Sequence, residues 1–323
     1  MSSAATPSTP LPVRTPGSRA RGRHRRPERP EIPTGSPALL LAVPSEANQG
    51  AQQIADELVS LVRAEQPGID IIAGYLAPVG DTLTDTAPVE APADGSADSS
   101  AGDPVAADAG PEAGAYVGAS VRESTRTIAD LLGSATEAGI PAPIVVPLLP
   151  GPTSAFQEAL AALGSGVATT DTLGPHPLLA EALHVRLSEA GLARADRARL
   201  FAVNTSADGI VLATAGGPEA LQLAEVTGVL LAARLAVPVV AASLDEPGAV
   251  AAAAAHLRGT GCAQPALAPY LIGPEVDGDL LKSVAAEADC PAAEPLGAYP
   301  TIARLILGLY LGALGIPQDA ELG

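Results

Sequence analysis

Few side chains in this sequence have the chemistry to bind a metal ion or to move a proton. The chain holds four histidines, and none of them lies between His24 and His176. Its two cysteines, Cys262 and Cys290, lack the spacing of a zinc site or a redox motif, so we expect reduced, partly buried thiols. Three carboxylates gather within residues 272–279. Such a cluster can bind a hard cation, but solvent and the helix dipole also stabilise carboxylates at a helix start.

The three histidines beyond residue 36 are weak candidates for a metal site. His176 sits between two prolines at a turn, where we expect a surface or packing residue. His184 and His256 fall in stretches with helical periodicity and are interpreted as residues on helix faces. His176 is therefore kept only as a weak metal candidate.

Two short segments offer hydrogen-bond donors to an anion. Thr153 and Ser154 bring hydroxyl groups to the start of a predicted helix, and Gly216 and Gly217 bring backbone N–H groups. The glycine pair is too short to be a dinucleotide-binding fingerprint. We treat these four residues as ligand-binding candidates.

The elements that would position these residues alternate between short apolar runs and helix-period stretches. In the first half the pattern predicts strands at 37–43, 69–76, 142–149 and 166–170, and helices at 49–64, 120–138 and 154–163. In the second half it predicts strands at 209–215, 237–243 and 264–272, and helices at 178–190, 219–235, 249–259, 276–287 and 299–314. The second half repeats the first, and this alternation predicts a doubly wound parallel sheet in each half.

The composition agrees with such sheets. The chain has 323 residues, of which 47% are hydrophobic, but only 2% are aromatic and there is no Trp. Its core must therefore consist of Ala, Val, Leu and Ile, which suits parallel strands buried on both faces. The length suffices for one large or two ordinary domains.

The charge is unevenly distributed. Residues 1–36 hold seven of the 18 basic and two of the 36 acidic residues, and we expect a disordered basic tail there. Residues 81–117 contain eight carboxylates and no basic residue, and are predicted to be an acidic disordered insert, either a spacer or a docking site for a protein partner. The rest of the chain is so acidic that it would repel nucleic acid and anionic membranes. Without a signal peptide or a long apolar run, we expect a cytoplasmic protein.

Several segments, in order along the chain, resemble the sirohydrochlorin chelatases of sirohaem and cobalamin synthesis, including the long bacterial forms with two fused modules. They are residues 38–43, 145–149, 173–183, 209–215, 230–239 and 296–300. The likeness extends over about residues 37–315, apart from the insert. It implies two tandem chelatase-like modules, 37–172 and 173–323, each a parallel sheet flanked by helices.

The resemblance implies a lyase activity, the insertion of Fe²⁺ or Co²⁺ as substrate metal into the polyanionic tetrapyrrole sirohydrochlorin. Such chemistry needs metal ligands and a base for two pyrrole protons, and imidazole suits both tasks. In the family one histidine follows the first strand in a His-Gly turn and another follows the third strand. An acidic residue often stands near the end of the second strand.

This sequence departs from the family at each of these positions. Pro44-Ser45-Glu46 replaces the His-Gly turn, the second histidine position falls near Ala155, and the acidic position falls near Ala77. Proline and alanine side chains can neither bind a metal nor carry a proton. Glu46 stands next to the lost histidine and, with Ser45, is a ligand-binding candidate, while Glu46 and His176 are the weak metal candidates.

Three functions remain open. The first is a pseudoenzyme that binds a tetrapyrrole, another metabolite or a partner without inserting a metal. The second is an active ferro- or cobaltochelatase that uses substitute ligands such as Glu46 or His176. The third is a non-catalytic scaffold that binds protein partners through the acidic insert and the basic tail.

Overall fold

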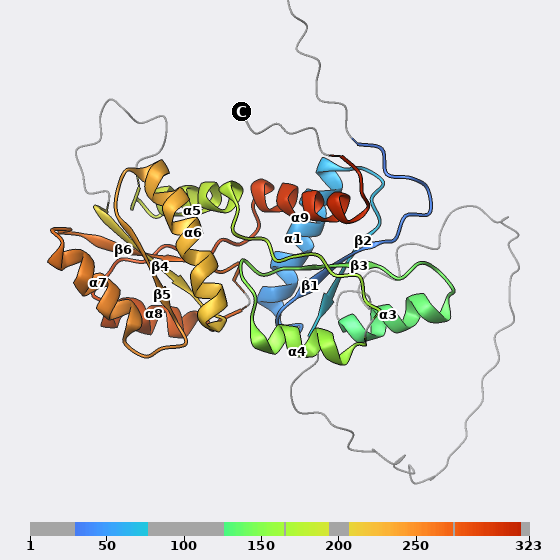
Figure 1. Ribbon diagram of the computed structural model, residues 1–323, viewed down its shortest axis with the longest axis horizontal. Coiled ribbons are helices and arrows are strands. Elements are labelled where there is room, and N and C mark those ends of the chain that lie inside the picture. The colour runs from blue at the N-terminus through green and yellow to red at the C-terminus, as the bar shows by residue number, and fades with distance from the viewer. Residues whose placement is uncertain (1–29, 77–125, 165, 194–206, 274, 318–323) are drawn as a thin grey trace, which may run out of the picture. The chain divides into compact units, whose positions relative to one another are not determined.

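The protein forms two three-stranded parallel sheets covered by helices (Figure 1). The computed structural model describes residues 30–76, 126–164, 166–193, 207–273 and 275–317. This architecture confirms the predicted fold class of two α/β modules. Residues 1–29 of the predicted tail and the whole predicted insert lie outside the described residues. Ile32, within the range predicted as tail, packs against the core.

The elements follow each other largely as the sequence predicts. The strands are β1 (Leu39–Val43), β2 (Ile71–Tyr75), β3 (Ile144–Pro147), β4 (Gly209–Thr214), β5 (Val239–Ser243) and β6 (Pro265–Pro269). The helices are α1 (Gln49–Glu65), α3 (Ile128–Glu137), α4 (Ser154–Ala162), α5 (Pro177–Glu189), α6 (Gly217–Leu235), α7 (Ala249–Gly259), α8 (Gly278–Glu287) and α9 (Pro300–Ala313). No helix in these ranges is long and apolar enough to cross a membrane.

The start of α3 differs from the prediction of a helix over 120–138. Among the described residues this helix begins only at Ile128, because Thr127 is its N-cap. The Thr127 hydroxyl accepts from the Asp130 N–H, and the Asp130 carboxylate accepts from the Thr127 N–H, which is a capping box. Thr127 itself is extended and pairs in parallel with Tyr75 at the end of β2.

The predicted strand over 166–170 is also smaller than expected. It is reduced to one parallel bridge between Val145 and Thr169. The second half repeats this arrangement with a bridge between Leu267 and Ala292. In both halves the chain then turns at a Leu-Gly pair, Leu173-Gly174 or Leu296-Gly297, and enters a helix with proline at its first position.

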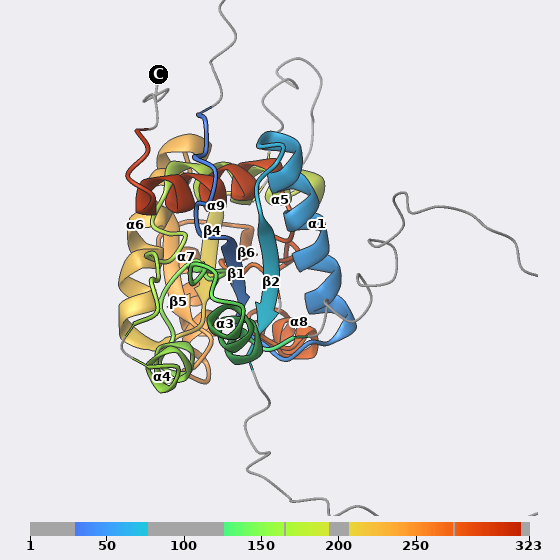
Figure 2. The same ribbon diagram turned by 90° about the vertical axis from the view of Figure 1, so that its right-hand side faces the viewer.

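These two helices, α5 and α9, are exchanged between the two sheets, since each follows one sheet along the chain and packs on the other. α5 packs on α6 of the second sheet, whereas α9 packs on α1 and β3 of the first; Figure 2 shows α9 beside α1. Arg186 on α5 holds the turn before α9, because its guanidinium donates to Pro295 O (2.7 Å) and Leu296 O (3.1 Å) and lies 4.8 Å from the Tyr299 ring centre.

The exchange produces one central core. A single buried cluster combines side chains of β1, such as Leu41, with side chains of β4, such as Leu212, and of α9, such as Ile306. The outer faces have separate apolar clusters, under α3 and α4 for the first sheet and under α7 and α8 for the second. The elements of each half are therefore stabilised in part by the other half.

We expect Ile302→Ala to lower the free energy of unfolding by about 2–4 kcal/mol, because Ile302 on α9 is fully buried and the truncation leaves a cavity. The control is Val229→Ala on α6, where the side chain is 69% exposed and a change within about 0.5 kcal/mol is expected. Urea unfolding followed by circular dichroism measures both. Equal stability of the two variants would show that α9 does not close the core.

Candidate functional site

The strand order puts the switch point of the first sheet at the carboxyl ends of β1 and β3, and we call the place between the loops there the crevice. The chain runs from β1 to β2 on one side and then back to β3 on the other, so the order is β2-β1-β3. Open parallel sheets bind ligands where the order reverses in this way. The loops at that point are residues 44–48 and 148–153, and their counterparts in the second sheet follow β4 and β6. Three predicted site positions, Pro44, Ser45 and Glu46, lie in the first of these loops.

Backbone and side-chain hydrogen bonds fix the conformation of the loop after β1. Ser45 O accepts from the Leu76 N–H at 3.1 Å, which ties the loop to the end of β2. The Ser45 hydroxyl donates to Glu46 O at 3.2 Å. The Asn48 side chain then caps α1 by accepting from the Ala51 N–H at 2.9 Å. The Glu46 side chain is exposed beside this loop, and Pro44 is half-buried.

The loop after β3 ends in a capping hydroxyl. Thr153 is the N-cap of α4, and its Oγ1 accepts from the Phe156 N–H at 3.3 Å. A hydroxyl in that role still has its own proton to donate. Ser154 and Ala155 are exposed in the first turn of α4, so Ala155 offers only a methyl group at the edge of the crevice.

The carboxyl ends of the two sheets meet at Gly216. A Cβ atom on this residue would lie 2.6 Å from Pro152 O and 2.9 Å from Thr153 Cγ2, and its φ is +116°. Only glycine tolerates both conditions. Of the predicted candidates, the structure thus brings Thr153 and Gly216 together across the two halves. Gly151 makes a similar approach to Ala220 on α6.

The backbone N–H groups of Gly216 and Gly217 donate hydrogen bonds to a side-chain carboxylate of the same chain, that of Asp245. They donate to Oδ2 of Asp245 at 2.9 and 2.8 Å, and the Ser243 hydroxyl donates to the same oxygen at 3.3 Å. These two N–H groups therefore already have an anionic partner within the chain.

Asp245 occupies the place in the second half that Ala77 occupies in the first. Val43 pairs with Tyr75 and Thr214 pairs with Ser243 in the same register, and each candidate position follows two residues later. Ala77 itself lies outside the described residues. From the sequence, the carboxylates of residues 272–279 were considered in the second half and Asp245 was not singled out; the equal spacing after the second strand of each half was the signal.

The histidines have structural partners. His176 is the N-cap of α5, and its Nδ1 accepts from the Leu178 N–H at 3.1 Å. Burial lowers the pKa of His176, which favours the neutral imidazole. His184 is buried and its Nδ1 accepts from Arg234 Nε at 2.9 Å, while His256 is exposed on α7. Within the described ranges, no three His, Cys, Asp or Glu side chains are grouped to hold a metal.

The Glu275 carboxylate is hydrogen-bonded to the backbone of its own loop. Its two carboxylate oxygens accept from the Ile272 and Gly273 N–H groups, each at 2.6 Å. Although these bonds favour the charged form, enclosure by the surrounding chain has the larger effect and raises the pKa of Glu275 to about 7.

The other two carboxylates of this loop, those of Asp277 and Asp279, have partners on α8. Asp277 caps α8 by accepting from the Asp279 N–H at 3.0 Å, and Asp279 forms an exposed ion pair with Lys282 at 2.9 Å. The three carboxylates therefore have separate partners, which agrees with solvation at a helix start and not with a cation site.

The comparisons with known proteins show a likeness of fold. No protein-family model and no curated protein matches the sequence. The sirohydrochlorin chelatase SirB from Bacillus subtilis subspecies spizizenii, in complex with cobalt, is similar at a TM-score of 0.53 and 12% identity, over 88% of this chain and 98% of that one. SirB from Bacillus subtilis with Fe³⁺ is similar at a TM-score of 0.53 and 14% identity, over 86% and 95% of the two chains.

We expect the free energy of unfolding to decrease as the pH rises from about 4.5 to about 7, through the window between the ordinary and the raised pKa of Glu275. The folded protein holds the proton more tightly than the unfolded chain, so this contribution is complete below the window and lost above it. Glu275→Gln should remove that part of the slope.

Urea unfolding at several pH values tests this, with the exposed Glu158→Gln as the control. If wild type and Glu275→Gln keep the same slope across the window, the proposed titration is wrong.

Proposed function

We propose that this protein binds a tetrapyrrole of the sirohydrochlorin type without inserting a metal into it. The observation that carries the proposal is the switch point between β1 and β3, where the loop after β1 has Pro44 and the first turn of α4 has Ala155 in place of the imidazoles that metal insertion needs. The fold supports the ligand class, because the two similar structures are described as sirohydrochlorin chelatases with cobalt or Fe³⁺ bound.

Metal insertion requires ligands that hold the ion and a base that removes two pyrrole protons. In the described loops and the first turn of α4, the polar side chains are the hydroxyls of Ser45, Thr153 and Ser154, the Glu46 carboxylate and the Asn48 amide, which caps α1. Hydroxyls are neutral at physiological pH and do not accept pyrrole protons. They can donate hydrogen bonds to the carboxylates of a tetrapyrrole, which suits a carrier or sensor in sirohaem or cobalamin metabolism.

A second candidate is an active chelatase in which Glu46 replaces the missing histidine. The exposed position of Glu46 beside the crevice supports it. This reading requires a metal-dependent insertion rate that Glu46→Ala abolishes. The scaffold reading instead requires a protein partner that is lost when residues 81–112 are deleted.

We expect sirohydrochlorin to change its absorbance spectrum on titration with the protein, because the crevice binds the macrocycle. With Co²⁺ or Fe²⁺ added, insertion should proceed no faster than in a control without protein. Insertion well above that background would overturn the proposal and favour the Glu46 site. An unchanged spectrum would overturn tetrapyrrole binding altogether.

The double variant Pro44→His/Ala155→His should gain Co²⁺-dependent insertion, at least about tenfold above wild type, since general acid–base groups typically contribute 10²–10⁴ in rate. Its two imidazoles would stand at the carboxyl ends of the neighbouring strands β1 and β3. The control is Val226→His/Val229→His on the exposed face of α6. An equal gain in both variants would show that added imidazoles act nonspecifically.

A further inference from the structure

The loop after β3 lies against the second half of the chain. Its Pro150 O accepts from the Tyr270 hydroxyl at 3.4 Å, and Tyr270 directly follows β6. A Cβ atom on Gly151 would lie 3.2 Å from the Ala220 Cα on α6, so the two main chains are in close contact. The loop after β1, by contrast, has its hydrogen bonds within the first half. The two loops of the crevice are therefore fixed by different halves.

A further contact of the loop after β3 involves the N-cap of α6. Gly216 occupies that position at a φ of +116°, and a Cβ there would lie 2.6 Å from Pro152 O, which only glycine avoids. This has a consequence for the helix, because an N-cap residue normally accepts from the first free N–H groups through its side chain. Glycine has no such side chain, so α6 lacks a cap from its own N-cap residue.

Asp245, which follows β5, supplies the missing acceptor. Its Oδ2 accepts from the Gly216 and Gly217 N–H groups at 2.9 and 2.8 Å, and its negative charge complements the positive end of the α6 dipole. Ser243 orients the carboxylate, because its hydroxyl donates to Oδ2 at 3.3 Å and accepts from the Asp245 N–H at 3.1 Å. The position of Gly216, and with it the surface on which the loop after β3 packs, therefore depends on Asp245.

The same surface determines where Thr153 lies. A Cβ on Gly216 would be only 2.9 Å from Thr153 Cγ2, so the Thr153 side chain is in contact with the start of α6. Its hydroxyl accepts from the Phe156 N–H and keeps its own proton for a ligand. Contact with Gly216 thus sets the position of a hydrogen-bond donor at the crevice.

We propose that Asp245 is a positioning residue for the crevice. Without touching the ligand, it fixes the first turn of α6, on which the loop after β3 packs, and so places the Thr153 hydroxyl for donation to a carboxylate of the ligand. The identity of the ligand rests on the proposed function, whereas the placement of the loop is independent of it.

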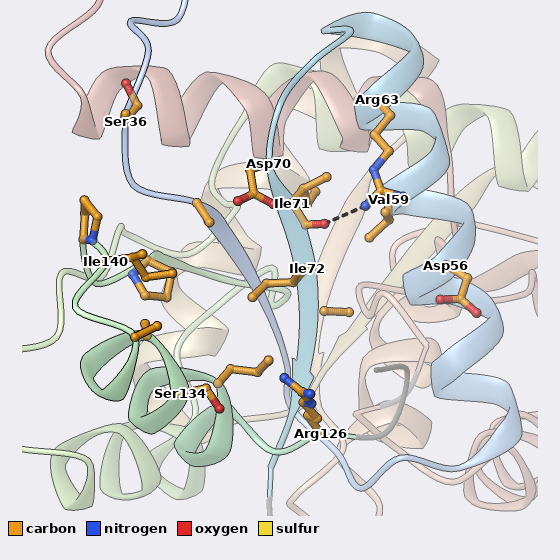
Figure 3. A pocket seen from close by; sticks show the side chains of 18 residues that line it. Ser36, Asp56, Val59, Arg63, Asp70, Ile71, Ile72, Arg126, Ser134 and Ile140 are labelled. Carbon is orange, nitrogen blue, oxygen red and sulfur yellow. Dashed lines mark hydrogen bonds between the residues drawn. The ribbon is translucent and has the colours of Figure 1, made fainter. Parts of the chain in front are cut away.

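The first half also contains a region that Asp245 should not affect. A cavity of about 660 Å³ along β2 is lined by described residues between Gly35 and Pro143 and by none of the second half. Figure 3 shows the Arg63 guanidinium donating to Ile71 O beside it, at 2.9 Å. This region serves as an internal reference for a change that starts at Asp245.

Hydrogen–deuterium exchange of the ligand-free protein tests the placement of the loop. Asp245→Ala should raise exchange over residues 150–157 at least about fivefold, because two backbone hydrogen bonds to a charged acceptor are lost. Asp245→Asn keeps an oxygen acceptor for both N–H groups and should stay within about twofold of the wild type. Exchange over residues 71–73 should not change. Unchanged exchange over 150–157 in Asp245→Ala, or an equal rise in both segments, would show that Asp245 does not place the loop.

A matched pair of glycine substitutions tests the contact by titration with sirohydrochlorin. Gly216 and Gly248 are both N-cap residues with a positive φ and no side-chain cap, but a Cβ on Gly248 would meet no atom closer than 3.8 Å. Gly216→Ala should weaken binding at least about fivefold, because it displaces the loop, and Gly248→Ala should change it by at most about twofold. Circular dichroism checks that each variant is folded. An equal loss in both variants would contradict a specific contact.

A double-mutant cycle tests whether Asp245 acts through Thr153. Thr153→Val keeps a methyl group against Gly216 and removes the hydroxyl. Asp245→Ala should weaken sirohydrochlorin binding about 3–10-fold in the wild type but at most about twofold in the Thr153→Val background. Additive losses would rule out an action through Thr153. Absence of binding by the wild type would overturn the proposed function and the role of Asp245 in binding, whereas exchange over 150–157 alone decides the placement of the loop.

Discussion

The exchange of α5 and α9 is the constraint on which the rest of the structure depends. Each helix follows the last extended segment of one sheet and packs on the other sheet's side, α5 on α6 and α9 on α1 and β3. Each sheet is therefore covered in part by a helix that follows the other sheet along the chain. The buried cluster extends from β1 to β4. Because apolar side chains of both halves, together with Tyr75, Tyr270 and Tyr310, are buried in one cluster, the two halves stabilise each other.

Close backbone approaches between the halves follow from this packing. Besides Gly216 against Pro152, a Cβ on Gly174 would collide with the Tyr270 hydroxyl and with Pro150 O. Tyr270 is fully buried, and its hydroxyl forms a hydrogen bond with the Thr227 hydroxyl at 2.9 Å. This bond gives the buried phenol hydroxyl a partner. The position of the crevice is thus set by glycines and a buried aromatic residue, and the exposed side chains of the loops do not determine it.

The sequence predicted the parts of this structure that depend on local patterning. Apolar runs identified β1 and β4 to within two residues, and helical periodicity predicted α7 over 249–259, the range that the structure has. The start of α3 was predicted too early, because the periodicity did not reveal that Thr127 and Asp130 form a capping box. The contact of Thr153 with Gly216 and the pairing of Asp245 with the glycine N–H groups were beyond reach, since they depend on how the two halves pack.

The side chains at the carboxyl ends of β1 and β3 contribute little to the stability of the fold, for a physical reason. Glu46, Ser154 and Ala155 are exposed, and Pro44 is only half-buried, so these positions add little to the apolar core. Asp245, which follows β5 at the spacing that Ala77 has after β2, has a structural role, because its carboxylate accepts from the Gly216 and Gly217 N–H groups. A substitution at position 245 therefore leaves two partly buried N–H groups without this partner and is costly, whereas a substitution at the exposed positions 46 or 155 is not.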